Sequence, residues 1–128
     1  DIFWKYGEER YSRQIARGIL RHRENRGKIE TTGELVSVIR ETLPAPVQRK
    51  MGGHPARKVF QALRIAVNDE LAVLEKGLSG AFELVRPGAS VAVVSYHSLE
   101  DRIVKHFFRE KQSGLDIQAR THNIPIGI

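Results

Sequence analysis

Residues 90–95, with the sequence Ser-Val-Ala-Val-Val-Ser, restrict the possible folds of this chain more than any other segment. The run is rich in β-branched residues and nearly continuously apolar, which is typical of a β-strand covered on both faces. A strand of that kind needs hydrogen-bonding partners along both edges. The rest of the chain does not supply them, so we expect the other strands to lie outside it. This predicts an α/β fold of which the chain holds only a part.

Other segments repeat apolar residues every three to four positions, as amphipathic helices do. They predict helices over residues 8–26, 31–43, 55–85 and 99–111, and Gly77 is the expected position of any bend in the third. Thr31 and Glu34 form a capping box at the start of the second helix. Prolines and glycines predict a flexible loop with a basic tip over residues 44–55, and we expect loop with at most one short strand after Ser113.

The overall charge favours a polyanionic partner. The 128 residues carry 21 Lys and Arg against 15 Asp and Glu, a formal net charge of +6.

The absence of cysteine excludes disulfides and thiolate metal sites. The longest apolar run, residues 91–94, is far shorter than the roughly 20 residues of a membrane helix, so we expect a cytoplasmic protein that does not bind a membrane.

Arginines recur at three- and four-residue spacing along the first predicted helix, which puts them on one side. They are Arg10, Arg13, Arg17 and Arg21. Arg49 and Lys50 add charge at the tip of the predicted loop. These residues are candidates for contact with the RNA backbone, although a merely solvated helix face is an equally good interpretation.

Residues 95–102, Ser-Tyr-His-Ser-Leu-Glu-Asp-Arg, hold the densest group of reactive side chains, at the predicted junction of strand and helix. Ligands of open α/β sheets bind at such strand ends. Ser98 and Asp101 are explained first as a helix cap and a first-turn carboxylate, whereas Ser95 and His97 have no such duty.

Three other kinds of site are excluded by spacing. No glycine flanks Ser95 or Ser98 as a nucleophile elbow requires. The five histidines lack the close spacing of helical metal-ligand pairs, so no metal site is expected. Gly52 and Gly53 follow no predicted strand, so they do not form a phosphate-binding loop.

Four motifs occur in an order that resembles the RsmH (MraW) family. They are residues 7–17 (Gly-Glu-Glu-Arg-Tyr-Ser-Arg-Gln-Ile-Ala-Arg), 54–57 (His-Pro-Ala-Arg), 60–71 (Phe-Gln-Ala-Leu-Arg-Ile-Ala-Val-Asn-Asp-Glu-Leu) and 95–102. The resemblance implies an S-adenosylmethionine-dependent methyltransferase that modifies the N4 amine of a cytidine in small-subunit (16S) ribosomal RNA. It also implies a Rossmann-like methyltransferase domain interrupted by an all-α helical domain. Residues 1–62 resemble the inserted domain, and residues 63–128 resemble the carboxy-terminal part of the Rossmann-like domain.

The family's glycine-rich first loop and its ribose-binding acidic residue have no counterpart in this sequence. We therefore expect a carboxy-terminal fragment without cofactor-binding residues, inactive alone, whose partners are ribosomal RNA and the missing amino-terminal half. The rival interpretation is a non-enzymatic basic helical module that binds RNA or assists assembly.

Position suggests roles for the reactive residues. A cytidine amine is a weak nucleophile that must be oriented and deprotonated, and Ser95 and His97 are the catalytic candidates for that work. The candidates for substrate contact are Tyr96, Ser98, Arg102, Arg64 and Asn68. Tyr96 would stack on a base and Arg102 would contact a phosphate. Arg64 and Asn68 share a helix face, and a helix-to-strand hydrogen bond is the slightly preferred explanation for them.

Overall fold

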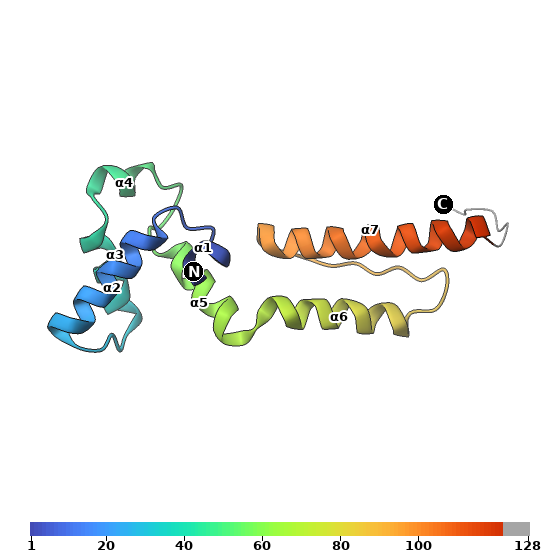
Figure 1. Ribbon diagram of the computed structural model, residues 1–128, viewed down its shortest axis with the longest axis horizontal. Helices are drawn as coiled ribbons and strands as arrows, with labels where there is room; N and C mark the ends of the chain where they lie inside the picture. Colours follow the sequence, from blue (N-terminus) through green and yellow to red (C-terminus); the bar gives the residue numbers. More distant parts are fainter. Residues whose placement is uncertain (122–128) are drawn as a thin grey trace. The chain divides into compact units, whose positions relative to one another are not determined.

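The computed structural model describes the backbone of residues 1–121 and the side chains of residues 1–113. Over that backbone the elements are all helices (Figure 1): α1 (Ile2–Lys5), α2 (Ser12–Arg26), α3 (Thr32–Thr42), α4 (Ala45–Lys50), α5 (Arg57–Asn68), α6 (Glu70–Leu84) and α7 (Ser98–Thr121). The prediction of an α/β fold with a partial Rossmann-like domain is therefore wrong for the described residues, and the expected helical part is only one portion of an all-helical structure.

The predicted strand is irregular backbone. Residues 85–97 connect α6 to α7 and include no strand, and Val94 is 77% exposed. β-Branched composition favours extended backbone, but a strand exists only where a neighbouring strand completes its hydrogen bonds. No other segment among residues 1–121 provides that neighbour.

The chain divides into two compact units, residues 1–68 and 69–128. The predicted continuous helix over residues 55–85 is interrupted at this division rather than near Gly77. Asp69 has a φ of 50°, which is left-handed backbone, and it separates α5 from α6. Asp tolerates this conformation better than most residues do. The domain boundary expected after residue 62 rests on the family resemblance and stays a prediction.

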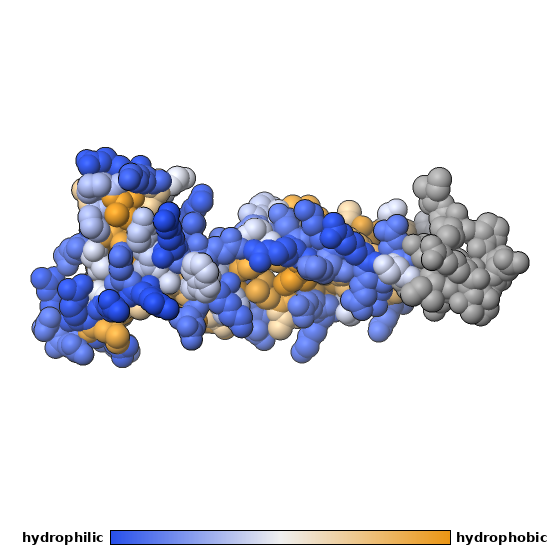
Figure 2. Space-filling model, turned by 45° about the horizontal axis from the view of Figure 1, so that its top comes forward, coloured by the Kyte–Doolittle hydropathy of each residue, from blue (hydrophilic) through white to orange (hydrophobic). Residues whose placement is uncertain are grey.

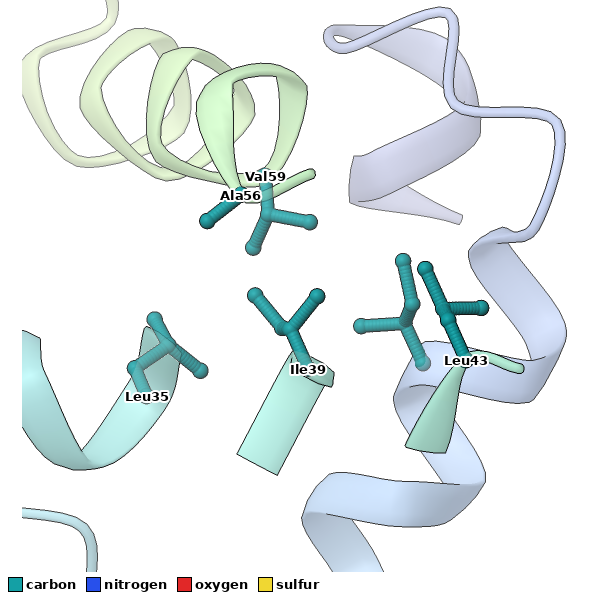
Figure 3. Close-up of a cluster of buried hydrophobic side chains, with 6 residues drawn as sticks. Leu35, Ile39, Leu43, Ala56 and Val59 are labelled. Carbon is teal, nitrogen blue, oxygen red and sulfur yellow. The ribbon is translucent and has the colours of Figure 1, made fainter. Parts of the chain in front are cut away.

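The first unit has a small apolar core in which α2 packs against α3 and α1 packs against α5. Ile15, Ile39 and Val59 are fully buried. Figure 3 shows Ala56 and Val59 facing Ile39, with Leu35 and Leu43 on either side of it. Helices of 11 to 15 residues gain most of their stability from such packing rather than from propensity.

Local chemistry sets the helix ends. The capping box of α3 is confirmed, because Thr31 Oγ1 accepts from Glu34 N at 3.1 Å. The Glu34 carboxylate reaches one residue further back than predicted and accepts from Glu30 N at 2.9 Å. The first long helix begins at Ser12 rather than Glu8, because Glu8 has a φ of 51° and cannot continue a helix.

The loop predicted for residues 44–55 is partly helical. Pro44 is the N-cap of α4 and Pro46 lies in its first turn, where the missing amide proton of proline breaks no helical hydrogen bond. Gln48 Nε2 then donates to the carbonyl oxygens of Arg40 at 2.9 Å and Leu43 at 2.7 Å, which satisfies the exposed end of α3.

In the second unit, α6 and α7 lie side by side and the segment between them runs back along them (Figure 1). Phe82 and Phe107 pack edge to face with ring centroids 6.1 Å apart, and Lys111 Nζ lies 4.9 Å from the centre of the Phe82 ring. α7 continues to Thr121, so the predicted end near Lys111 and the loop after Ser113 are wrong as far as residue 121. The remainder of that prediction, residues 122–128, lies outside the described residues.

The second unit buries little of its apolar surface. Among its described side chains Leu78 is buried, whereas Leu84 is 88% exposed and Val73 is 61% exposed. Figure 2 shows hydrophobic surface along this unit between hydrophilic bands. No helix within the described part of the chain has the length and apolar character needed to cross a membrane.

Candidate functional site

Exposed arginines cover one side of α2. Arg13, Arg17 and Arg21 follow one another at four-residue steps in this helix, and all three are exposed. Arg10 is also exposed but precedes the helix, so the predicted helical spacing holds for three of the four residues. Arg17 and Arg21 line a hollow of about 620 Å³ with Leu20, which is 53% exposed. We refer to Arg10, Arg13, Arg17 and Arg21 as the arginine face.

Trp4 extends the arginine face with an aromatic ring that the sequence analysis did not single out. Its side chain is 65% exposed on α1. It lines a hollow of about 560 Å³ together with Arg10, Tyr11 and Arg13. An exposed indole among guanidinium groups is the combination on which unpaired bases stack while cations hold their phosphates. The signal in the sequence is the single Trp of the chain, a few residues before the arginines.

Arg49 and Lys50 lie in the last turn of α4, and both are exposed. Lys50 lines a cavity with Arg10, Arg57 and Lys58. Arg10 therefore borders two hollows, one on the arginine face and one beside α4.

The reactive segment 95–101 is folded around the start of α7. Ser95 Oγ donates to the Asp101 carboxylate. Tyr96 N donates to Glu100 Oε2 at 2.9 Å, and Glu100 N donates to His97 Nδ1 at 3.4 Å. His97 precedes the first helical residue, so its ring and the Glu100 carboxylate form a reciprocal capping arrangement. The prediction that Ser95 and His97 have no duty at the helix start is wrong, because both side chains bond to groups in the first turn of α7.

The capping bond also limits the chemistry of His97. A neutral imidazole whose Nδ1 accepts a hydrogen bond carries its proton on Nε2. His97 Nε2 lies 3.4 Å from Glu100 Oε1, and its side chain is 9% exposed. That nitrogen is buried and has no hydrogen-bond partner among the described residues. Tyr96, by contrast, is 89% exposed and free to meet a base.

The remaining candidates are divided between the units. Ser98 and Arg102 lie in the first turns of α7, and both are exposed. Arg64 and Asn68 lie one turn apart in α5, also exposed, and belong to the first unit. Ser98 and Arg102 thus belong to the second unit, whereas Arg64 and Asn68 belong to the first.

The expectation that this chain lacks cofactor-binding residues stays a prediction. Nucleotide cofactors of α/β enzymes sit on a glycine-rich loop between a strand and a helix. Residues 1–121 include no strand, and Gly52 and Gly53 lie in the irregular connection between α4 and α5. Among the described side chains, no three His, Asp or Glu residues are placed to hold a metal ion together.

Comparison with known protein families shows to which class of protein the chain belongs. The chain matches a family of methylases, which are S-adenosylmethionine-dependent methyltransferases, over residues 1–126. It belongs to the MraW methylase family. The family resemblance of the four motifs is thereby confirmed.

Proposed function

We propose that this chain is the RNA-contacting portion of an S-adenosylmethionine-dependent enzyme that methylates the N4 amine of a cytidine in small-subunit ribosomal RNA. Membership of a methylase family supports the reaction class. The observation that supports RNA as the substrate is the arginine face with Trp4 beside it.

The charges of the first unit suit a polyanion. Arg13, Arg17 and Arg21 present exposed cations at successive turns of one helix, and guanidinium groups bind phosphates in a bidentate manner. Specific RNA recognition mostly targets unpaired nucleotides, whose bases stack on aromatic rings. Trp4 supplies such a ring on the same surface.

The 95–102 segment is proposed to meet the substrate through its exposed groups. Tyr96 would stack on a base, and Arg102 at the start of α7 would contact a phosphate. Ser95 and His97 would fix the conformation of the segment through their hydrogen bonds at the start of α7. In that conformation they would orient the cytidine amine. Cytoplasmic location follows from a ribosomal substrate and is proposed with it.

The exposed apolar surface of the second unit supports a further polypeptide partner. Leu84, Val94 and Val73 expose most of their side chains, and large apolar patches on soluble proteins usually mark contact surfaces. We propose that this surface packs against the portion of the same enzyme that binds the cofactor.

The test is the salt dependence of RNA binding after replacing Arg10, Arg13 and Arg17 with Gln. Loss of about three phosphate contacts should lower the slope of log K against log salt by roughly two to three units. Replacement of Lys76, Lys105 and Arg109 in the second unit gives the same change of net charge and serves as the control. Equal slopes for both variants would show that the arginine face is only solvated.

A non-enzymatic RNA-binding module is the second candidate, because residues 1–121 are helical and their basic surface could bind RNA by itself. It makes a different prediction for the complete enzyme. RNA binding that persists without any methyl transfer to small-subunit RNA would favour the module.

A further inference from the structure

Trp4 lies on a helix that is too short to be stable by itself. α1 has four residues, and isolated helices shorter than roughly 12 residues are at best marginal in water. Phe3 packs against the core of the first unit, whereas Trp4 is 65% exposed and buries little of its own surface. The place of Trp4 beside the arginines therefore depends on contacts that neighbouring residues make.

The turn after α1, residues 6–8, is held on α5 by two side chains of that helix. Gln61 Nε2 donates to the Tyr6 carbonyl oxygen at 3.2 Å. Lys58 Nζ donates to the Glu8 carbonyl oxygen at 3.4 Å. Lys58 and Gln61 are three positions apart in α5, so they lie on the same face of the helix. That face therefore holds the turn at both of its ends.

Gly7, between these two carbonyl groups, lets the backbone of the turn approach the backbone of α5. It is buried, and a Cβ atom built on it would lie 2.5 Å from the Lys58 carbonyl oxygen and 2.8 Å from the Phe3 carbonyl oxygen. Helix backbone cannot move aside as the end of a flexible side chain can. Glycine at position 7 is thus a condition for α1 to pack on α5.

The same turn sets the position of Trp4 relative to α2. Glu8 N donates to the Trp4 carbonyl oxygen at 3.1 Å. Glu9 follows with 1% exposure, and its Oε1 accepts from the backbone N of Tyr11, the N-cap of α2, at 3.0 Å. α2 also packs on α3, independently of the turn. A displaced turn would therefore move Trp4 while Arg13, within α2, stays in place.

We propose that Gly7 and Gln61 are positioning residues for RNA binding, because they keep Trp4 beside Arg10 and Arg13, where its ring can stack on an unpaired base. This inference rests on the proposed RNA substrate and adds α5 to the elements that determine RNA affinity. The physical reason is preorganisation. An aromatic side chain that is fixed before RNA binds loses less conformational entropy on binding, so its stacking contributes more to affinity.

Two variants of the full chain loosen the turn in different ways. Gln61→Met keeps the length of the side chain but loses the donor to the turn. Gly7→Ala forces the turn away from α5. The chain has one Trp, so its intrinsic fluorescence anisotropy reports on Trp4 alone. Without RNA, both variants should lower this anisotropy. Gln48→Met, which loses bonds of the same kind at the end of α3, is the matched control and should not.

RNA affinity shows whether this placement matters for binding. Binding of dye-labelled UUUUU, an unpaired strand whose bases stack without sequence preference, is measured by the anisotropy of the dye. Gln61→Met and Gly7→Ala should each weaken binding by about two- to tenfold, the factor that corresponds to one neutral hydrogen bond. In a Trp4→Ala background neither change should weaken binding further, because both act through the indole ring.

The outcomes separate this inference from the proposed function. Unchanged Trp4 anisotropy in both variants would overturn the positioning role. Equal losses of affinity with and without the indole would also overturn it, because a general loss of stability does not depend on Trp4. Absence of UUUUU binding by the unmodified chain would instead refute the proposed RNA substrate, and the positioning role would fall with it.

Discussion

Gly18 of α2 lies directly against the side chain of Thr42 at the end of α3. A Cβ atom built at Gly18 would overlap Thr42 Oγ1 and lie 2.9 Å from Thr42 Cγ2. Thr42 Oγ1 cannot easily move away, because it donates to the Val38 carbonyl oxygen at 2.7 Å. The absence of a side chain at Gly18 thus sets how closely the two helices approach.

We expect Gly18→Ala to destabilise the first unit by about 1–3 kcal/mol despite the higher helix propensity of alanine. Urea unfolding followed by circular dichroism measures the change. Gly33→Ala in α3 is the matched control, because its added Cβ would meet only Thr31 Oγ1 at 3.9 Å. Thr42→Ala should recover part of the loss in the double variant, and strict additivity would contradict the proposed overlap.

The cap of α3 gives a second prediction. Thr31→Ala removes the acceptor for Glu34 N and should cost about 1 kcal/mol of unfolding free energy. Thr31→Ser keeps that acceptor and should cost much less. If both variants lost the same stability, the methyl group of Thr31 rather than its hydroxyl would be responsible.

Features that depend on a few neighbouring residues could be predicted from the sequence. The Thr31 capping box is an example, because every atom that it needs lies within a few residues of Thr31. The predicted strand at residues 90–95 failed for the opposite reason. Its apolar, β-branched composition is real, but strand formation depends on a partner that residues 1–121 do not supply.

The candidate site was predictable only in part. The spacing of Arg13, Arg17 and Arg21 correctly indicated one exposed helix face. Glu9 looked like an ordinary surface carboxylate, because the residues that surround it include members of α4 and α5, which lie far along the chain. His97 was missed as a cap because histidine is not among the usual N-cap residues.

Trp4 provides a third prediction, for RNA binding. Trp4→Ala should weaken binding of a short unpaired oligonucleotide by about tenfold, because stacking on one aromatic ring is worth roughly 1–3 kcal/mol. Trp4→Phe should retain an intermediate affinity. Ile2→Ala, on a 44% exposed residue of the same short helix, is the control. The same affinity in Trp4→Ala and the unmodified chain would exclude a stacking role.

The last prediction separates two roles of His97, capping α7 and contacting the substrate. His97→Ala removes the ring that accepts from Glu100 N and should lower the thermal midpoint as well as methyl transfer by the complete enzyme. His97→Asn restores a capping acceptor but lacks the Nε2 donor near Glu100 Oε1. If His97 orients the reacting amine, His97→Asn should keep the midpoint near that of the unmodified enzyme while methyl transfer stays one to two orders of magnitude lower. Ser95→Ala, which loses the bond to Asp101, should resemble His97→Ala more mildly. Full activity in His97→Asn would make His97 a capping residue alone and leave Tyr96 as the better candidate in this segment, because its side chain is 89% exposed.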